Sequence, residues 1–409
     1  MATILFENCT LLDVVAGAML PGRHVLVLDG LIREVSDRPI SSKDAQRFDL
    51  RGRTLMPGLC DAHVHVTQLV ANPSALRESA PSYVSAQSSV VLREMVHRGF
   101  TTVRDAGGAD YGLAAAVDEG LFVGPRILFS GHALSQTGGH GDHRGRHEDH
   151  IVFCAACVGR SGRVCDGADE MRRTARDELR KGASQIKLMV SGGVTSPLDR
   201  IESSQFSPEE IRAAVEEAAD QDRYVMAHAY TSRAINRALD CGVRSIEHGN
   251  MIDEPTAAKL AAKGAFLVPT VVVYWAMATE GRSVGMPERY QPKVAAVHDA
   301  AMRGLEIAVR QGLSMAFGTD LFGPMHRHQA REFSLRAEIQ KPIDVIRAAT
   351  LHAAELFQMP GEIGVIAPGA RADLLVVDGD PLADLNRLQE QGRYMDVIMK
   401  DGAFIVNRL

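Results

Sequence analysis

The middle of the chain alternates short apolar runs with amphipathic segments of helix length, between positions 55 and 354. One such segment, residues 208–221, follows Ser207, and Glu210 stands three positions after this serine, as in a capping box. A second long helix is predicted over residues 292–312. Eight strand–helix alternations favour a (β/α)8 barrel. The predicted strands are residues 57–66, 101–105, 127–131, 185–190, 225–230, 245–248, 266–271 and 314–320.

The two ends of the chain carry strand patterns instead. Residues 2–54 hold short alternating runs, separated by turn sequences at Asp29-Gly30 and Arg51-Gly52 of the kind that joins antiparallel hairpins. Strands return near the C-terminus, around a turn at Asp401-Gly402. We therefore expect both ends to pair into one small β-domain. The predicted boundaries are residues 1–56 plus 360–409 for this domain and 57–359 for the barrel, which makes the chain an α/β protein.

Composition adds only broad limits. The 409 residues are 45% hydrophobic and 23% charged, with a net charge of −6 and both signs scattered. No basic stripe suggests nucleic acid or anionic lipid as a partner. Met1 to Asp13 lack the pattern of a signal peptide, no run of about 18 apolar residues predicts a membrane span, and six cysteines are too few for a disulfide framework. The expected location is the cytoplasm.

Candidate chemistry falls at the ends of the predicted strands. His63 and His65 are two positions apart, so both imidazoles lie on one face of a strand. Active-site groups of a barrel gather at the C-terminal ends of its strands. Neutral imidazole binds zinc, iron, nickel or copper. The pair alone is also compatible with a purely structural role.

Lys187 interrupts an otherwise apolar predicted strand. A buried lysine costs several kcal/mol unless it is paired or its pKa falls. Its amine either reaches the barrel rim, or it is carbamylated by carbon dioxide and becomes a carboxylate that can bridge two metal ions. His228, His248 and Asp320 end the fifth, sixth and eighth predicted strands. A shared metal site explains why all these residues fall at strand ends.

This ordered set of motifs resembles the amidohydrolase superfamily, whose members are binuclear metal hydrolases with a TIM-like (β/α)8 barrel. The resemblance covers nearly the whole chain and implies that the two ends form a β-sandwich domain. The segments that carry it are residues 57–65 (PGLCDAHVH), Lys187, His228, His248, residues 318–320 (GTD) and residues 366–374 (IAPGARADL).

Carried over position by position, the resemblance implies a ligand set. His63, His65 and Asp320 would hold one divalent ion, and His228 and His248 would hold the other. Lys187, as a carbamate, and a hydroxide would bridge the two ions, which we expect to be Zn²⁺.

Within the superfamily, the chain is similar to the branch of prolidases and other Xaa-amino-acid dipeptidases, which is related to imidazolonepropionase. Imidazolonepropionase has a mononuclear site without a lysine at the position of Lys187, which argues against that activity here. The resemblance implies a homo-oligomeric dipeptidase that cleaves Xaa-Pro or related N-acyl amino acid substrates. The matching segments are residues 102–108 (TVRDAGG), 135–143 (SQTGGHGDH), 186–194 (IKLMVSGGV) and 228–230 (HAY).

The implied ligands suggest a mechanism. Two divalent ions lower the pKa of a bridging water towards about 7 and so supply hydroxide. Asp320 would take the proton and pass it to the leaving amine. His140 is expected to hold the carbonyl oxygen of the tetrahedral intermediate, with His143 as the rival, while the hydroxyl of Tyr230 would bind the substrate carbonyl or carboxylate.

A dipeptide also needs a cation for its carboxylate. Arg327 and His328, after the eighth predicted strand, and Arg200, after the fourth, are the candidates, and solvated surface side chains are the alternative interpretation of each.

Three other interpretations remain open on the sequence. Cysteines and histidines within residues 132–167 suggest a structural zinc site, although a mobile lid over the barrel mouth is the preferred interpretation of this long segment. The site could instead belong to a deaminase or cyclic-amide hydrolase of the same superfamily. The chain could also be a non-catalytic scaffold, against which all six filled ligand positions argue. The candidate zinc ligands are Cys154, Cys157, Cys165, His147 and His150.

Overall fold

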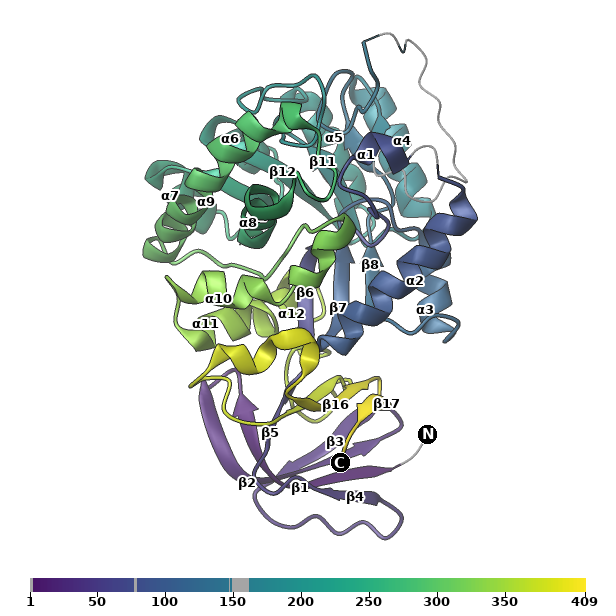
Figure 1. Ribbon diagram of the computed structural model, residues 1–409, viewed down its shortest axis with the longest axis vertical. Helices are drawn as coiled ribbons and strands as arrows, with labels where there is room; N and C mark the ends of the chain where they lie inside the picture. Colours follow the sequence, from purple (N-terminus) through teal and green to yellow (C-terminus); the bar gives the residue numbers. More distant parts are fainter. Residues whose placement is uncertain (1–2, 77–78, 147, 149–161) are drawn as a thin grey trace.

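The two ends of the chain meet in one mixed sheet. The computed structural model describes residues 3–76, 79–146, 148 and 162–409. In Figure 1 the purple N-terminal strands and the yellow C-terminal strands lie together in the lower part of the molecule. Leu55 of the N-terminal segment pairs with Val376 of the C-terminal one in an antiparallel ladder. The strand order is β17 (Ala403–Asn407), β16 (Met395–Lys400), β15 (Leu374–Val377), β5 (Thr54–Pro57), β1 (Ile4–Asp13), β2 (Ala18–Leu28) and β3 (Leu31–Ser36), with β4 (Gln46–Asp49) also paired with β1.

All three turns predicted for the chain ends are present, but only two of them join antiparallel hairpins. Asp29-Gly30 joins the antiparallel pair β2 and β3, and Asp401-Gly402 joins β16 and β17. Arg51-Gly52 instead connects β4 and β5, which both run parallel to β1. The prediction of a hairpin there is wrong. The pairing register of β1 shifts around Asn8, which has a positive φ of 53°, and β4 pairs with β1 before this residue while β5 pairs with it after.

Parallel strands and helices make up the rest of the described chain. One sheet has the order β10 (Gly162–Val164), β9 (Ala133–Ser135), β11 (Gln185–Met189), β12 (Tyr224–Thr231), β13 (Ser245–Met251) and β14 (Phe266–Val268). A second sheet has the order β6 (Leu59–Val64), β7 (Phe100–Asp105) and β8 (Arg126–Phe129).

Backbone hydrogen bonds link these two sheets on both sides. The Ser184 amide, just before β11, donates to the Phe129 carbonyl of β8 (2.8 Å). On the other side, the Leu267 amide of β14 donates to Ser314 (3.0 Å), and the Ala62 amide of β6 donates to Phe317 (2.7 Å). Residues 314–320 therefore lie between β14 and β6.

Two of the predicted strands differ in detail from the structure. The strand predicted over 266–271 ends at Val268, because Thr270 adopts a left-handed backbone (φ 46°) and a helix begins at Val271. Residues 314–320 form only an isolated bridge, between Met315 and Leu267, instead of a regular strand. The short strands β9 and β10 were not expected.

Helices surround the parallel strands in the upper part of Figure 1. The predicted capping box is present: the Glu210 amide donates to Ser207 Oγ, and the Ser207 amide donates to Glu210 Oε2. The helices are α1 (Pro73–Leu76), α2 (Pro81–His97), α3 (Tyr111–Asp118), α4 (Ala168–Arg180), α5 (Pro208–Ala219), α6 (Ser232–Asp240), α7 (Glu254–Ala262), α8 (Val271–Glu280), α9 (Gln291–Arg310), α10 (Arg331–Ala337), α11 (Pro342–Ala348) and α12 (Leu351–Leu356). Short 3₁₀ turns are η1 (Glu288–Tyr290), η2 (Gly323–His328), η3 (Leu385–Leu388) and η4 (Glu390–Gly392).

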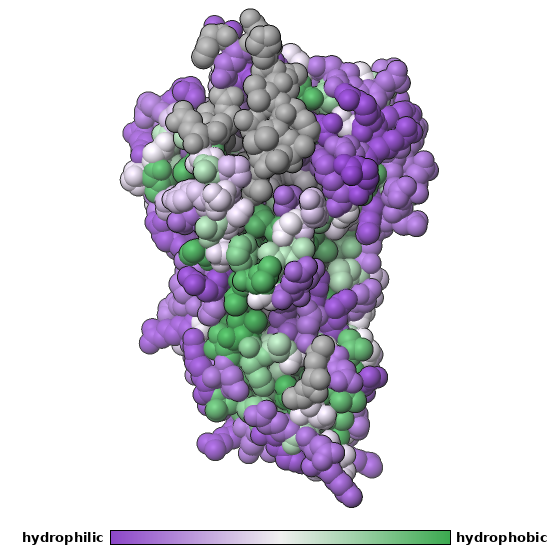
Figure 2. Space-filling model, turned by 90° about the vertical axis from the view of Figure 1, so that its right-hand side faces the viewer, coloured by the Kyte–Doolittle hydropathy of each residue, from purple (hydrophilic) through white to green (hydrophobic). Residues whose placement is uncertain are grey.

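The surface is mostly polar. Figure 2 shows the side that carries α2 and α3, where hydrophilic residues cover much of both ends and hydrophobic residues gather near the middle. Leu121 and Val123, after α3, are among the exposed large hydrophobic side chains. Among the described residues, none of the helices has the length and hydrophobicity needed to cross a bilayer. The homo-oligomer stays a prediction.

Candidate active site

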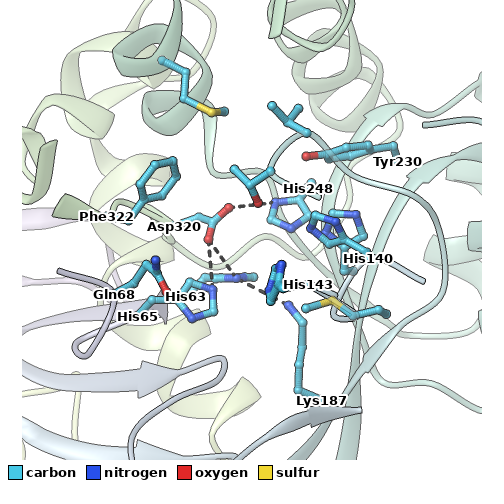
Figure 3. Close-up of a pocket in the computed structure, with 15 residues that line it drawn as sticks. His63, His65, Gln68, His140, His143, Lys187, Tyr230, His248, Asp320 and Phe322 are labelled. Atoms are coloured by element: carbon cyan, nitrogen blue, oxygen red, sulfur yellow. Dashed lines mark hydrogen bonds and ion pairs between the residues drawn. The ribbon is translucent and has the colours of Figure 1, made fainter. Parts of the chain in front are cut away.

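A cavity opens at the C-terminal ends of the parallel strands. It receives side chains from β6, β11, β12, β13 and α8, from the residues that follow β6, β9 and β11, and from residues 320 and 322 (Figure 3). All six residues predicted as metal ligands lie in its wall. The lining residues are His63, His65, Gln68, His140, His143, Lys187, Met189, Val194, Thr195, His228, Tyr230, His248, Met277, Asp320 and Phe322.

Three of these residues form a compact group of possible ligand atoms. Single ligand atoms of His63, His65 and Asp320 all lie within 4.8 Å of one another. Asp320 Oδ1 is 3.4 Å from His63 Nε2 and 3.2 Å from His65 Nε2. Two imidazole nitrogens and a carboxylate oxygen facing one point are a donor set suited to zinc.

His63 is oriented by a hydrogen bond to a buried carboxylate. Its Nδ1–H donates to Glu247 Oε2 (2.7 Å), and both side chains are essentially inaccessible. The guanidinium of Arg104 donates to the same carboxylate (2.9 Å) and to the carbonyl of Ala62 (2.7 Å). Such an outer carboxylate fixes the imidazole tautomer and turns the other ring nitrogen towards a metal. Here that nitrogen is Nε2.

The other three histidines are oriented in the same way. His65 Nδ1 bonds to the Gly107 carbonyl (2.8 Å), and His248 Nδ1 bonds to Thr270 Oγ1 (2.8 Å). His228 instead uses Nε2, which bonds to the Gly192 carbonyl (3.0 Å). Each ring therefore keeps one nitrogen for the cavity: Nε2 of His65 and His248, and Nδ1 of His228.

Strained backbone accompanies this arrangement. His248, Thr270 and Asp320 all have positive φ, of 75°, 46° and 54°. Left-handed backbone is unfavourable for residues with a Cβ atom and concentrates at functional sites. Two of these residues are candidate ligands, and the third bonds to one of them. The unfavourable backbone conformations thus occur at the residues that form the candidate metal site.

Lys187 lies at the bottom of the cavity, with 1% of its surface exposed. Its Nζ is 3.5 Å from His63 Nε2. Burial lowers the pKa of Lys187 to about 8, although Glu247 and Asp320 oppose this by favouring the cation. A neutral lysine amine is the form that reacts with carbon dioxide, and this site makes that form accessible near neutral pH.

Burial also keeps most of the histidines uncharged. Burial, together with the neighbouring Lys187 and histidines, lowers the pKa of His63 and His228 well below the usual value. The pKa of His248 falls to about 3, mainly through burial. His65 differs: although burial opposes it, the adjacent Asp320 carboxylate raises its pKa. Uncharged imidazole is the form that binds metal.

His140 and Tyr230 line the cavity beside the histidines. The His140 ring stacks on His228, with centroids 4.4 Å apart, and burial lowers the pKa of His140 to about 4. The ring of Tyr230 is 4.6 Å from that of His228, and its hydroxyl accepts a hydrogen bond from Tyr274 (3.2 Å). His143 also lines the cavity.

The candidate cations for the substrate carboxylate are not brought to the cavity. Arg327 and His328, in η2, both pair with Glu280 of α8. This carboxylate holds both side chains, and neither residue belongs to the cavity wall. Arg200 is 85% exposed and faces Glu202 at 3.6 Å.

Several supporting residues were missed by the sequence analysis. Besides Glu247 and Arg104, Asp61 lies two positions before His63 and is fully buried. Asp61 accepts from the His63 amide (3.1 Å) and from the hydroxyl of Thr319 (2.6 Å), the residue before Asp320. It thereby ties two ligand-bearing segments together. Each of these three supporting residues is a charged residue within a buried strand, and this feature of the sequence could have indicated its role.

The alternative zinc site falls mostly on residues that the structure does not describe. Its candidate ligands Cys154, Cys157, His147 and His150 lie outside the described residues. Cys165 is described and buried. The lid over residues 132–167 stays a prediction.

The chain is similar to known hydrolases over almost its whole length. The model of the amidohydrolase family matches residues 54–403. The ochratoxinase of Aspergillus niger is 30% identical over 404 residues, which covers 92% of this chain and 82% of that protein. A solved amidohydrolase structure is 49% identical, covers both chains completely and has a TM-score of 0.98. A prolidase solved with N-methylphosphonate-L-proline is 45% identical, covers 99% of this chain and 100% of that chain, and also has a TM-score of 0.98.

Proposed function

The chain belongs to the amidohydrolase family, and we propose that it is a binuclear metal-dependent dipeptidase that cleaves Xaa-Pro or related N-acyl amino acid substrates. It is a hydrolase that acts on C–N bonds. One observation carries the proposal: a buried lysine of lowered pKa lies among four metal-competent histidines and Asp320. The similarity to a prolidase supports the choice of substrate.

We further infer that the parallel strands form one (β/α)8 barrel. The hydrogen bonds of residues 314–320 with β14 and β6, and of Ser184 with β8, support a closed ring of eight parallel segments. The mixed sheet of the two chain ends would be the separate β-sandwich domain, with the boundaries predicted from the sequence.

The residues present fit two metal ions. His63, His65 and Asp320 would hold one ion, and His228 and His248 the other, because each imidazole has its remaining nitrogen bonded to protein. Lys187 would bridge the ions as a carbamate. Its neutral amine attacks carbon dioxide, a C–N bond forms, and the nitrogen loses a proton to solvent.

Bound zinc ions supply hydroxide at neutral pH and polarise the scissile carbonyl. Asp320 then acts as the proton carrier. Its carboxylate has a lowered pKa because, although burial opposes this, His65 and His248 stabilise the anion. It can hold the proton of the attacking water briefly and deliver it to the leaving nitrogen. A secondary amine such as proline leaves only when protonated, so this delivery is essential.

Substrate contacts are assigned to His140 and Tyr230. Both are buried beside the candidate ligands, and Tyr230 offers a hydroxyl that receives one hydrogen bond and retains its own hydrogen. This hydrogen can be donated to the substrate carbonyl or carboxylate. Arg327 and His328 could take part only if they separated from Glu280.

A deaminase or cyclic-amide hydrolase is the second candidate function. An unmodified Lys187 would favour it, since a free ammonium does not bridge two ions. A non-catalytic scaffold is the third candidate, and the complete ligand set argues against it.

The test is an activity screen of the purified protein with added zinc or cobalt. We expect Xaa-Pro dipeptides or N-acyl amino acids to release a free amino acid. Ammonia from aminopurines or ring opening of lactams would instead identify the second candidate, and a protein without metal or turnover would identify the third. Lys187→Ala should abolish turnover, whereas Lys259→Ala, which removes a partly buried lysine paired with Asp240 outside the cavity wall, should not. Turnover retained by the Lys187 variant would exclude a carbamate bridge.

A further inference from the structure

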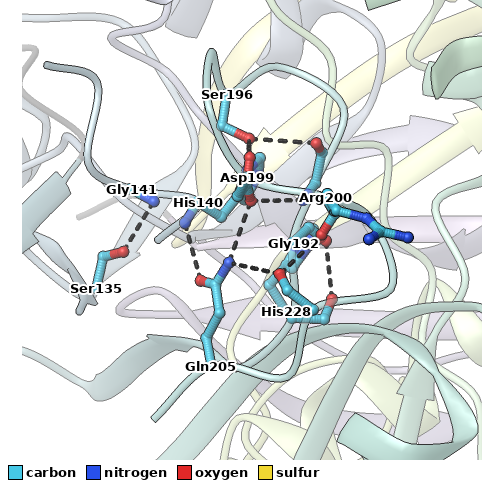
Figure 4. Close-up of polar contacts among 12 residues, drawn as sticks. Ser135, His140, Gly141, Gly192, Ser196, Asp199, Arg200, Gln205 and His228 are labelled. Atoms are coloured by element: carbon cyan, nitrogen blue, oxygen red, sulfur yellow. Dashed lines mark hydrogen bonds and ion pairs between the residues drawn. The ribbon is translucent and has the colours of Figure 1, made fainter. Parts of the chain in front are cut away.

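The ring of His140 is tied to the loop that follows β11 (Figure 4). His140 Nδ1 lies 2.8 Å from Ser196 Oγ, and the Ser196 hydroxyl in turn contacts Asp199 Oδ1. The His140 amide donates to Gln205 Oε1 (2.8 Å), and Gln205 Nε2 donates to Asp199 Oδ2 (3.1 Å). Asp199 is thus connected to both the ring and the backbone of His140.

The loop leaves the ring no freedom to move away. A Cβ atom at Gly193 would lie 2.1 Å from Cε1 of His140, so the ring packs directly on the glycine backbone. Its stacking on His228 adds a second contact. Lys293 of α9 anchors the loop by donating to the carbonyls of Gly193 (2.8 Å) and Ser196 (3.1 Å).

The position of one hydrogen atom follows from these contacts. Asp199 accepts from the Gly193 amide (3.0 Å), from Gln205 and from Lys293 (3.4 Å), as a carboxylate does. The Ser196 hydroxyl has a single hydrogen, and its oxygen neighbours, Asp199 and the Gly193 carbonyl, are both acceptors. If the hydroxyl donated to His140 instead, its oxygen and the Asp199 oxygen would face each other without a hydrogen between them. The hydroxyl therefore accepts from the ring, and His140 Nδ1 carries the hydrogen.

We propose that Asp199, acting through Ser196, is a positioning residue that holds His140 as the Nδ1–H tautomer and presents the bare Nε2 to the substrate. Among the described residues, Nε2 has no hydrogen-bond partner, and the ring lines the cavity. Asp199 and Ser196 are themselves nearly inaccessible, so neither touches the substrate. The inference rests on the proposed function for the claim that His140 contacts a substrate.

This arrangement changes the role expected for His140. A bare Nε2 accepts hydrogen bonds and does not donate them, so the neutral ring cannot hold a carbonyl oxygen. Its partner would be an N–H of the substrate, such as the α-ammonium group of a dipeptide or the amide N–H of an N-acyl amino acid. The substrate oxygen is then left to the metal site and Tyr230.

Nuclear magnetic resonance of the zinc-loaded full chain tests the proposal. Long-range ¹⁵N–¹H spectra at neutral pH report which imidazole nitrogen carries the hydrogen, and the signal that disappears in His140→Gln identifies His140 among the 15 histidines. We expect the hydrogen on Nδ1 in the wild type. In Asp199→Asn the new amide can donate to Ser196 Oγ, which frees the hydroxyl to donate to Nδ1 and moves the ring hydrogen to Nε2.

A second variant and a matched control complete the experiment. Ser196→Ala removes the acceptor and should yield a mixture of tautomers, and it decides the question if Asp199→Asn does not fold. Ser85→Ala is the control, because Ser85 Oγ donates to the Pro81 carbonyl (3.1 Å) on α2, outside the loop that holds His140. We expect kcat/KM for dipeptides to fall about tenfold to a hundredfold in the first two variants, with the control unchanged.

Two results would overturn the proposal: a hydrogen on Nε2 in the wild type, or an unchanged tautomer in both variants. The tautomer measurement needs no substrate. An enzyme that shows the expected tautomers but hydrolyses no dipeptide would therefore disprove the proposed function and leave the positioning role intact.

Discussion

Replacing Glu247 with glutamine tests how far the candidate metal site depends on one buried carboxylate. Glu247 lies between the His63 imidazole and the Arg104 guanidinium, both of which donate to it. Its side chain and that of Arg104 have 0% exposure. A glutamine has the same shape, but one end of its amide is a donor. In either orientation of the amide, its NH₂ group faces another donor, either the Nδ1–H of His63 or the guanidinium of Arg104.

Both orientations of the glutamine are costly. An NH₂ group towards His63 forces the ring into the tautomer with hydrogen on Nε2, which cannot bind metal. An NH₂ group towards Arg104 leaves a buried guanidinium without its counter-charge, and breaking a buried pair costs about 3–5 kcal/mol. Loss of an outer partner of a ligating histidine lowers metal affinity by about 10–100-fold, or roughly 1.4–2.7 kcal/mol.

The assay is a zinc competition titration, combined with thermal unfolding of the metal-free protein. We expect Glu247→Gln to bind zinc at least tenfold more weakly and to unfold at a lower temperature. Glu254→Gln serves as the control, because Glu254 pairs with Arg310 on the surface with more than half of each side chain exposed. Its effect on both measurements should lie within experimental error. Wild-type zinc affinity in the Glu247 variant would refute the role assigned to this carboxylate.

Three further predictions follow from the same structure. Because burial lowers the pKa of Lys187 to about 8, the neutral fraction of this lysine grows with pH. When zinc is added back to chelator-treated protein at fixed dissolved carbon dioxide, activity should therefore recover faster at pH 8 than at pH 6. A recovery rate that does not depend on carbon dioxide would contradict the carbamate. Burial raises the pKa of Glu332 from 4.5 to about 8. Between these pH values the folded protein keeps a proton on Glu332 that the unfolded chain releases. The free energy of unfolding therefore falls as the pH rises through this range. Glu332→Gln should therefore raise the unfolding temperature more at pH 8 than at pH 5, and an equal gain at both would disprove the shift. Lys293→Met removes the anchor of the Gly193 loop and should lower kcat several-fold (about 1 kcal/mol) while zinc content, measured by atomic absorption, stays unchanged.

The candidate metal ligands could be located in the sequence because their positions follow from simple geometry, whereas their roles came from the resemblance to the amidohydrolase superfamily. Side chains two apart on a strand share a face, which brings His63 beside His65 and His228 beside Tyr230. Parallel strands then place their C-terminal ends together. No contact between distant residues had to be known for this prediction.

The partners of these residues depend on long-range contacts and were not predicted. Arg104 and Glu247 are 143 positions apart, and only the folded arrangement of β7 and β13 pairs them. Glu280 similarly meets Arg327 across 47 positions, which removes that arginine from the substrate site. The early end of β14 depends on the left-handed backbone of Thr270, for which threonine provides no local signal.

The joining of both chain ends in one sheet has a consequence for synthesis on the ribosome. Thr54 of β5 donates to the carbonyl of Gly379, 325 positions later. At about 5–20 residues per second, β5 waits some tens of seconds for β15 to emerge. During this time its unpaired edge can pair with other chains. Nascent chains that stall before Leu374 should therefore depend on chaperones, although every candidate metal ligand has already been made.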